Sequence, residues 1–469
     1  MIKREVKMKK IFLLAICLCS VFAFFTACNG DEQDPTPGLT TDDLQGEKFY
    51  YLGSIIIADP SDEDKDIEPG TLPYMESRED EVMYNQCLFI EQTYNCKIIR
   101  GGFNFDSTSA FASAFAAGNV NADFCSASFK ELRDYYQAGI LEDLEQLENL
   151  DASDEAKWGI EAKRDAGRYG GVLYAFPVAG SMYVPRFLTY SGAIIYNYVL
   201  YEDFNIGTTP KEMVEEGDWT FDNFLTLIQD CSDLSGQRPI YGLENQCSLL
   251  SIAIGANGSN VIVNRNGKFV SGLTLDATVN ALEWVRKLNQ TGCIGGNIAN
   301  DTAVFAAMTS DNAIRTECPT VHWVPMPTGP DSTEETNNTG AYFGYHEKGT
   351  SVFKHTADPD RKELIAFVMD KLFAPTDEWG ETGYDEYMSR NFFDTVDDYN
   401  VYKEQSINMI YNYGLEVLND SEFADSYMNI MNGSVEASFT GSIKNQLSSL
   451  TTALNERICK PMNEANKRG

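Results

Sequence analysis

Basic residues and histidines are scarce in this chain. Lys and Arg number 36 against 70 Asp and Glu, which gives a formal net charge of -34 over 469 residues. Nucleic-acid binding needs clustered Lys and Arg to neutralise phosphates, and because no such cluster occurs a nucleic-acid partner is excluded. The three histidines, His322, His346 and His355, supply little material for a His-rich metal site or a His-dependent catalytic triad. We therefore expect neither a metal centre nor a cofactor.

The cysteines follow no metal-binding pattern. No two of them form a CxxC pair, so neither a zinc site nor an iron–sulfur site is indicated. Beyond the N-terminal segment we expect most of them to be buried thiols, and a Cys87–Cys96 disulfide stays open as an alternative. These cysteines are Cys87, Cys96, Cys125, Cys231, Cys247, Cys293, Cys318 and Cys459.

Catalytic motifs are also missing. The sequence contains no GxSxG elbow, no Walker loop and no GxGxxG turn. Residues 62–66 (DEDKD) begin like a calcium loop, but Ile67 replaces the required glycine and Pro73 the required glutamate. His346-Glu347 begins a zinc-protease motif, but Thr350 stands where the second histidine is needed. We expect a protein that is not an enzyme, although a glycosidase that uses two carboxylates stays open because acids are so numerous.

The one long apolar run lies at the N-terminus. Lys and Arg are concentrated in residues 1–10, apolar residues follow from Ile11 to Phe25, and Thr26-Ala27-Cys28 ends the segment. A basic start, an apolar run shorter than the about 20 residues of a spanning helix and small residues at the boundary are typical of a secretory signal. Cys28 resembles the cysteine of a bacterial lipobox, before which the signal is cleaved. An ordinary signal with an incidental cysteine is the alternative, and Met8 is a second candidate start.

Residues 28–46 are polar and acidic, with two prolines. Such a segment is an extended tether that holds a folded body away from a membrane surface. We expect a signal peptide over residues 1–27, acyl chains on Cys28 that insert into membrane lipid, and a protein at the extracytoplasmic face of the cell membrane.

Strands and helices alternate in the first part of the body. Residues 49–57, 96–100 and 122–128 are rich in β-branched, aromatic or small apolar residues and predict strands. Apolar residues at helical spacing predict helices between them, over 83–94 and 107–119, and after 128. This order favours an α/β fold built from right-handed βαβ units, in which ligands lie beyond the carboxyl ends of the strands.

The pattern changes near residue 170. Residues 170–180 and 187–197 predict two extended segments that pair with each other. Thr220 is placed to cap a helix, with Trp219 packing on Phe224 as a staple. Further predictions are a hairpin turn at 264–268, helices over 279–288 and 364–372, and a helical final part of the chain.

Six segments, taken in order, resemble the extracellular solute-binding proteins of ABC importers, the family that contains maltose-binding protein. The third of them is similar to the family's most recognisable feature, a Gly-containing turn followed by a strand that ends in Tyr-Asn. The segments are FAAGNVNADF (115–124), YYQAGILEDL (135–144), YGGVLYAFP (169–177) with IIYNYVLYEDFNI (194–206), EEGDWTFDNFLTL (215–227), AVFAAMTSDNAI (303–314) and VHWVPMPTGP (321–330).

The resemblance implies the two-lobe fold of periplasmic binding proteins, with three hinge crossings. Lobe one would comprise residues 47–178 and 321–376, and lobe two residues 179–320 and 377–469. The ligand would lie in the cleft between the lobes, and lobe closure would bury it.

The resemblance also implies which residues contact the ligand. Lobe one and the crossings would contribute Ser54, Ser126, Phe129, Ser181, Tyr183, Tyr342, Phe343 and Tyr345. Lobe two would contribute Asn245, Asn257, Asp311, Asn312 and Phe439. For each of them, packing or solvation is the alternative to ligand contact.

The expected function is that of a lipid-anchored solute-binding subunit of an ABC importer, a monomer that delivers a sugar or oligosaccharide to permease subunits. Tryptophans that the family often carries are replaced here, by Ala127 and within 310–314, so other aromatic residues must stack on the sugar. The alternatives are a sensor that presents its ligand to a membrane receptor and the surface glycoside hydrolase named above.

Overall fold

The structure is a computed structural model, and it divides into two compact units, Met1–Asp43 and Leu44–Gly469. Nearly all described residues belong to the second unit. Within the described residues no helix is both long enough and apolar enough to span a bilayer. The described residues are 41–52, 78–101, 105, 107–177, 192–244, 248–265, 268–309, 318, 320–333, 336, 348–355, 358, 360–374, 383–408 and 443–465.

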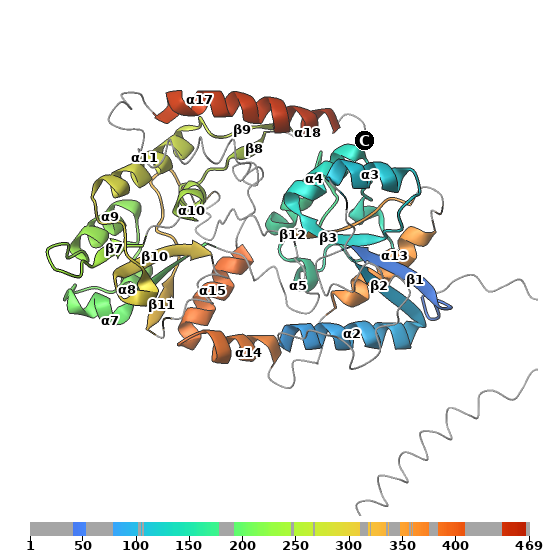
Figure 1. Ribbon diagram of the computed structural model, residues 1–469, viewed down its shortest axis with the longest axis horizontal. Helices are drawn as coiled ribbons and strands as arrows, with labels where there is room; N and C mark the ends of the chain where they lie inside the picture. The colour runs from blue at the N-terminus through green and yellow to red at the C-terminus, as the bar shows by residue number, and fades with distance from the viewer. Residues whose placement is uncertain are drawn as a thin grey trace, which may run out of the picture. The chain divides into compact units, whose positions relative to one another are not determined.

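The first sheet has the strand order β12-β3-β1-β2 (Figure 1). Its β1 pairs in parallel with β2 and β3, whereas β12 returns antiparallel to β3. The predicted parallel βαβ pattern is therefore confirmed for the first three strands. The bounds are β1 (Glu47–Leu52), β2 (Cys96–Gly101), β3 (Phe124–Ser128) and β12 (Lys348–Val352).

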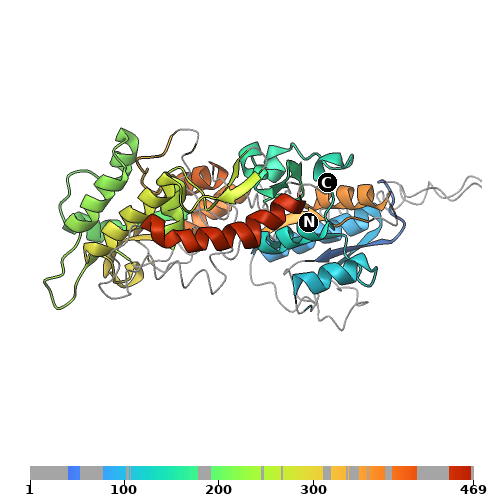
Figure 2. The same ribbon diagram turned by 90° about the horizontal axis from the view of Figure 1, so that it is seen from above.

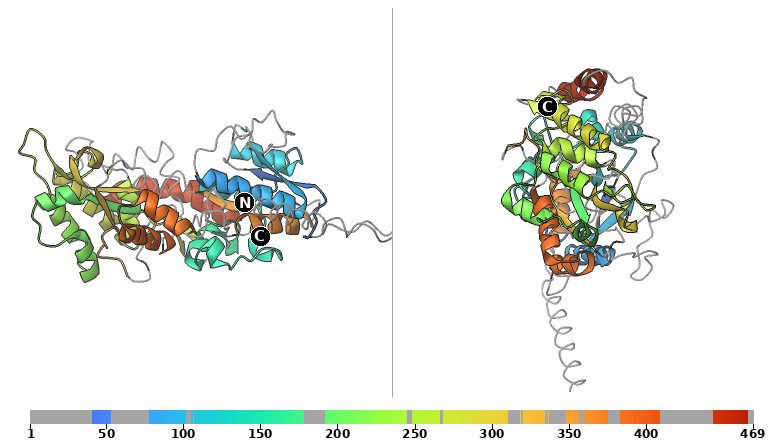
Figure 3. Two further views of the ribbon diagram at one scale, coloured as in Figure 1. Left: turned by 90° about the horizontal axis from the view of Figure 1, so that it is seen from below. Right: turned by 90° about the vertical axis from the view of Figure 1, so that its left-hand side faces the viewer.

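Helices cover both faces of this sheet, as the strand order requires. The chain moves from β1 to β2 and then back past β1 to β3, so two right-handed crossovers place their helices on opposite faces. These helices are α2 and α3, and Figure 3 shows them on either side of β1. The buried side chains of β3 support this placement. Phe124 and Cys125 are neighbours and point to opposite faces of the sheet. Phe124 packs in the same core cluster as α2, and Cys125 packs in the same core cluster as α3. The helices of this sheet are α2 (Arg78–Tyr94), α3 (Thr108–Ala116), α4 (Phe129–Ala138) and α13 (Arg361–Leu372).

Short elements lead from the first sheet to the first crossing. The predicted pairing of 170–180 with 187–197 is wrong, because β5 pairs with β4 and the later segment joins another sheet. Phe176 bridges Thr350 of β12 instead. These elements are η2 (Leu144–Gln146), α5 (Glu155–Trp158), α6 (Glu161–Arg164), η3 (Asp165–Gly167), β4 (Arg168–Tyr169) and β5 (Val172–Leu173).

The second sheet has the order β11-β6-β10-β7. All six residues of β6 are buried, since it lies between two antiparallel neighbours, β10 and β11. The pairing of β11 corrects the predicted boundary at residue 321, because this strand belongs to the second sheet and the return to the first lobe comes after it. The strands are β6 (Gly192–Asn197), β7 (Tyr241–Leu243), β10 (Ala303–Thr309) and β11 (Val321–Val324).

The predicted capping signal at Thr220 correctly marks the start of one helix of this lobe, α9. Thr220 accepts a hydrogen bond from the Asn223 N–H, and Trp219 packs on Phe224 with ring centroids 5.1 Å apart. The strands on either side of the predicted turn, β8 (Ile262–Arg265) and β9 (Lys268–Ser271), pair as an antiparallel hairpin. The helices are α7 (Tyr198–Asp203), α8 (Pro210–Glu216), α9 (Phe221–Asp230), α10 (Ser248–Ala256), α11 (Asp276–Gln290), η5 (Ile298–Asn300), α14 (Gly383–Phe392) and α15 (Val396–Asn408).

The chain passes between the two sheets three times. It leaves the first sheet between β5 and β6, returns between β11 and β12, and leaves again between α13 and α14, since α15 packs on β11. It ends in α17 (Ile443–Leu454), the π-turn η8 (Asn455–Cys459) and α18 (Lys460–Ala465), one continuous run that Figure 2 shows in red. Two lobes with three crossings are the predicted fold.

No disulfide joins the cysteines of the described residues. Cys87 and Cys96 are both buried thiols, so the Cys87–Cys96 bridge is not formed. Burial, helped by Glu91 and Cys87, raises the pKa of the Cys96 thiol to about 12, and burial, helped by Asp230, raises that of Cys231 to about the same value. Such thiols are protonated and unreactive at neutral pH.

Candidate functional site

Three strands of the first sheet meet at one edge, where ligands of this type of sheet lie. The last residue of β1, Leu52, is opposite Cys125, and the first residue of β12, Lys348, is opposite Ser128. The end of β1, the end of β3 and the start of β12 therefore share an edge, which we call the carboxyl edge. Of the predicted ligand contacts, Ser126 and Phe129 lie here.

Ser126 and Phe129 are held in place by tight local packing. Ser126 is buried in β3 opposite Thr350, and Phe129 is the first residue of α4. A capping box fixes this start, since the Ser128 hydroxyl accepts from the Glu131 N–H while the Glu131 carboxylate accepts from the Ser128 N–H at 2.8 Å. A Cβ at Gly349 would approach the Phe176 carbonyl oxygen to 2.9 Å, so glycine is needed for this close approach. The strand-to-helix corner is rigid and half-buried.

Asn257 has a structural role. It is fully buried, and its amide donates to the Ala277 carbonyl at 2.6 Å and to Asp331 at 3.0 Å, while its oxygen accepts from the Asp331 N–H at 3.0 Å. These bonds tie α10 to α11 and to the segment after β11. Because the amide group of Asn257 already makes three hydrogen bonds inside the lobe, its role fits packing, the alternative to ligand contact.

All other predicted contacts lie outside the described residues, as do Cys28, Cys247, His346 and the acidic segment 62–66. The contacts concerned are Ser54, Ser181, Tyr183, Asn245, Asp311, Asn312, Tyr342, Phe343, Tyr345 and Phe439. Described neighbours show where several of these segments begin. Leu52 and Lys348, which flank two of them, are at the carboxyl edge, and Glu244 and Thr309, which flank two more, end β7 and β10 in the second sheet.

Glu244 is a positioning residue that sequence patterns did not indicate. It follows β7 and is buried, and its carboxylate accepts from the Ile298 N–H at 2.9 Å and from the Asn297 amide at 3.2 Å. It thereby fixes the end of β7, where the segment with Asn245 begins. Its partners are more than 50 positions away in sequence, so no local pattern could identify it.

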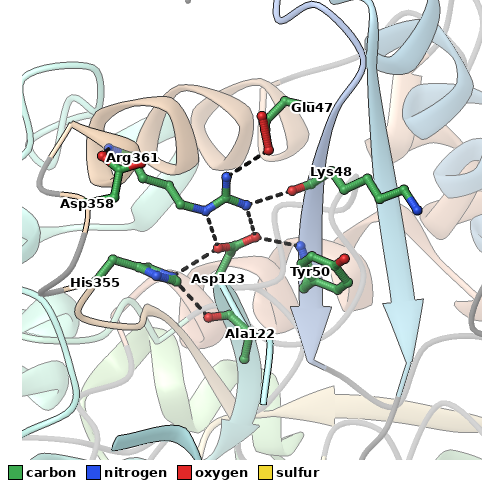
Figure 4. Close-up of polar contacts among 8 residues, drawn as sticks. All are labelled: Glu47, Lys48, Tyr50, Ala122, Asp123, His355, Asp358 and Arg361. Atoms are coloured by element: carbon green, nitrogen blue, oxygen red, sulfur yellow. Dashed lines mark hydrogen bonds and ion pairs between the residues drawn. The ribbon is translucent and has the colours of Figure 1, made fainter. Parts of the chain in front are cut away.

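A buried charge cluster lies at the opposite end of β3 and holds the returning chain on the first sheet (Figure 4). Asp123, 1% exposed, accepts from Arg361 at 3.0 and 2.8 Å, from His355 at 3.0 Å and from the Tyr50 N–H at 2.8 Å. Burial acts to raise the pKa of Asp123, but the hydrogen bonds from His355 and Arg361 outweigh it and hold that pKa below its usual range. The cluster joins β1, β3, the segment after β12 and α13.

A second ion pair fastens α15 to the second sheet. The Asp398 carboxylate is buried and accepts from the Trp323 N–H at 2.9 Å, while His322 Nδ1 lies 3.1 Å from it. The hydrogen bond to Asp398 raises the pKa of His322, and burial opposes this in part. Tyr198 stacks on the imidazole of His322, with ring centroids 4.5 Å apart.

This pair predicts a pH dependence. Because the pKa of His322 is higher in the folded than in the unfolded chain, the pair stabilises fully below the unfolded value of about 6.5 and is lost as pH rises through the folded value. We expect an NMR titration of His322 above the ordinary value, and Asp398→Asn should return it towards that value. The exposed Lys211–Asp397 pair offers the control Asp397→Asn, which should change little. A wild-type His322 that titrates at or below its ordinary pKa would contradict this.

In the described part of the chain, no three His, Cys, Asp or Glu side chains are grouped so that they could hold a metal ion. The two buried charge clusters described above, around Asp123 and Asp398, consist of ion pairs that hold elements of the fold together. What the described site offers is a rigid corner with a serine, a phenylalanine and the ends of neighbouring strands, which suits binding by hydrogen bonds and aromatic contact.

Comparisons with known structures agree on the fold. No protein-family model matches the sequence, and no curated protein matches it. The structure is similar to the galacto-N-biose-/lacto-N-biose I-binding protein of an ABC transporter from Bifidobacterium longum, with 14% identity, TM-score 0.56 and 90% of this chain and 99% of that chain covered. It is also similar to the cyclic alpha-maltosyl-1,6-maltose binding protein from Arthrobacter globiformis, with 12% identity, TM-score 0.57 and coverage of 90% and 100%.

A third similar structure is an ABC substrate-binding protein from Listeria monocytogenes in complex with cycloalternan, with 14% identity, TM-score 0.54 and coverage of 88% and 99%. The similarity extends over almost the whole length of all three structures, so it includes both lobes and the crossings. The chain has the two-lobe fold of the solute-binding proteins of ABC transporters.

Proposed function

We propose that this chain, which has the two-lobe fold of ABC solute-binding proteins, is the solute-binding subunit of an ABC importer and binds a sugar or oligosaccharide between its lobes. The observation that carries the proposal is full-length structural similarity to three proteins of which two are named for a sugar that they bind and the third was solved with one. The carboxyl edge of the first sheet supports it, because a serine, Ser126, and an aromatic residue, Phe129, both lie there.

The chemistry of the proposed contacts fits a sugar. Aromatic rings pack against the apolar C–H faces of a pyranose, while hydroxyl and amide groups bond its polar edges. We assign Phe129 and Ser126 to the described part of the site. The further contacts that we propose are Ser54, Ser181, Tyr183, Tyr342, Phe343 and Tyr345 for lobe one and the crossings, and Asn245, Asp311, Asn312 and Phe439 for lobe two.

Binding works by lobe closure, without making or breaking a covalent bond. A ligand that touches both lobes is bound more tightly by the closed form, so it shifts the population towards that form. A shift from 1:99 to 99:1 requires the ligand to favour the closed form by about 5.5 kcal/mol. The permease subunits of the importer would recognise that loaded form.

A screen by thermal shift tests the ligand class. Melting temperature rises with RT ln(1 + [L]/Kd) for any ligand that binds the folded chain only. We expect neutral mono- or oligosaccharides to raise it, with amino acids and oligopeptides as negative controls. If a peptide or polyamine alone raises it, the sugar assignment fails while a transport role survives, and turnover of a bound oligosaccharide would show a hydrolase instead.

Attachment to the membrane is a separate part of the proposal. Two or three acyl chains on Cys28 would anchor the chain stably, since each buried CH₂ contributes about 0.8 kcal/mol. We expect Cys28→Ala to abolish incorporation of labelled palmitate and to move the protein from the membrane fraction to the soluble fraction. Cys17→Ala, within the predicted signal, is the control and should leave both unchanged. Palmitate incorporation that survives in Cys28→Ala would refute the anchor.

A further inference from the structure

The C-terminal helical run holds the outer edge of the β8–β9 hairpin through two asparagines. The Asn463 side chain accepts from the Phe269 N–H and donates to the Phe269 carbonyl, both at 2.8 Å. The Asn455 side chain accepts from the Ser271 N–H at 2.9 Å. A two-stranded hairpin has little stability of its own, and its edge carries unpaired backbone groups. The two amides, which we call the asparagine clasp, occupy the edge where a third strand would pair.

The π-turn between α17 and α18 makes this clasp geometrically feasible. Asn455 and Asn463 are eight positions apart, whereas two α-helical turns span about seven. A π-turn takes up about one residue more than an α-turn, so with η8 in place two turns bring both asparagines to the same side. The buried residues Leu454 and Met462 have the same spacing and face the core together. If these eight positions followed a regular α-helix instead, Asn463 would be turned about 80° away from β9.

The far end of the same run contacts the other lobe. The helix α18 packs on α4. Burial raises the pKa of the Cys459 thiol, and the positive charge of Arg133 in α4 opposes this rise in part. Cys459 and Met462 are 2% and 1% exposed and belong to the same buried cluster as Tyr136 of α4. Figure 1 shows α17 and α18 reaching from the hairpin to α4. The helix α4 is also the one that begins at Phe129, in the candidate site.

We propose that this helical run is a pivot strut: the asparagine clasp fastens it to lobe two, its packing on α4 fastens it to lobe one, and the lobes turn about it. Close-packed contacts do not slide continuously, so a contact that joins two moving lobes is retained only near the axis of motion. The strut narrows the range of lobe orientations in the free protein. Its role in ligand binding rests on the proposed function, because lobe closure is the binding mechanism there.

Loss of the asparagine clasp tests the strut without any ligand. Asn455→Ala with Asn463→Ala removes the hydrogen bonds of the clasp and leaves the chain length unchanged. The control Glu456→Ala, in the same π-turn, removes only the exposed pair with Lys460 and leaves both clasp asparagines in place. Spin labels at Gln92→Cys in lobe one and Glu215→Cys in lobe two, both exposed, report the distribution of interlobe distances.

We expect a narrow distance distribution in the unmodified background and in Glu456→Ala, and a clearly broader one in the double variant. Equal widths in all three proteins overturn the strut. For a sugar that binds the unmodified chain, the broader ensemble should weaken affinity by roughly 3- to 30-fold, because closure must order more conformations. If no sugar binds at all, the proposed function fails. The widths of the interlobe distance distributions then still show whether the strut restricts the lobes.

Discussion

Asp123→Asn is expected to lower the free energy of unfolding by about 3 kcal/mol, the lower end of the range for breaking a buried ion pair. Asparagine has the same shape and can still accept from the Tyr50 N–H, but it leaves the Arg361 charge without its main partner. The loss stays at the lower end because the Arg361 side chain is 17% exposed and keeps Glu47 as a partner at 3.1 Å. Equilibrium urea unfolding measures it.

The matched control is Asp165→Asn, which removes an exposed carboxylate from Arg168 and should cost less than about 1 kcal/mol. The pH dependence gives a second readout. Because the pKa of Asp123 is lower in the folded chain, its stabilisation is complete above the unfolded value of about 3.9 and is lost as pH falls through the folded value. Wild-type stability should therefore fall more steeply on acidification than that of Asp123→Asn. Similar losses in the two variants would contradict the structural importance of the cluster.

Phe129→Ala is expected to weaken sugar binding by about tenfold, which corresponds to about 1.4 kcal/mol. Loss of the ring removes an aromatic face from the carboxyl edge, while the capping box of Ser128 and Glu131 keeps the start of α4 in place. Calorimetric titration measures affinity, and the melting temperature of the free protein shows whether the fold is intact. Tyr342→Ala, in a second proposed contact segment, should act in the same direction.

The exposed phenylalanine of α2, Phe89, supplies the control, because it is 57% exposed and lies on a different element. Phe89→Ala should leave affinity unchanged. If Phe129→Ala and Tyr342→Ala also leave affinity unchanged in a chain that binds a sugar, both assignments are wrong and the stacking residues lie elsewhere in the site.

Local patterns in the sequence predicted several helices and a hairpin turn well, because the interactions that form them join residues close together in the sequence. The stripe of Cys87 and Ile90 identified α2, since residues three or four apart share a helix face. The hydroxyl of Thr220 reaches an N–H only three residues ahead, so that cap depends on no distant part of the chain. The turn at 264–268 needs only its own residues to form.

Pairings between distant segments were predicted poorly, for the opposite reason. An apolar run such as 192–197 can pair with any strand that presents a complementary edge, and its sequence does not say which. In the structure it lies between β10 and β11, over a hundred residues further on, and not beside 170–180. The same cause produced the misplaced boundary at residue 321, because an isolated strand carries no mark of the sheet to which it belongs.

The amino-acid sequence by itself determined the class of fold, the capped helices and the likeness to ABC solute-binding proteins, because composition, periodicity and short motifs are properties of neighbouring residues. Only the tertiary structure decided that Asn257 ties α10 to α11, that Asp123 meets Arg361 across 238 positions, and that a π-turn aligns Asn455 with Asn463 on β9. Each of these depends on which polar groups are brought within hydrogen-bonding distance when the chain closes long loops, and spacing along the sequence does not encode that distance.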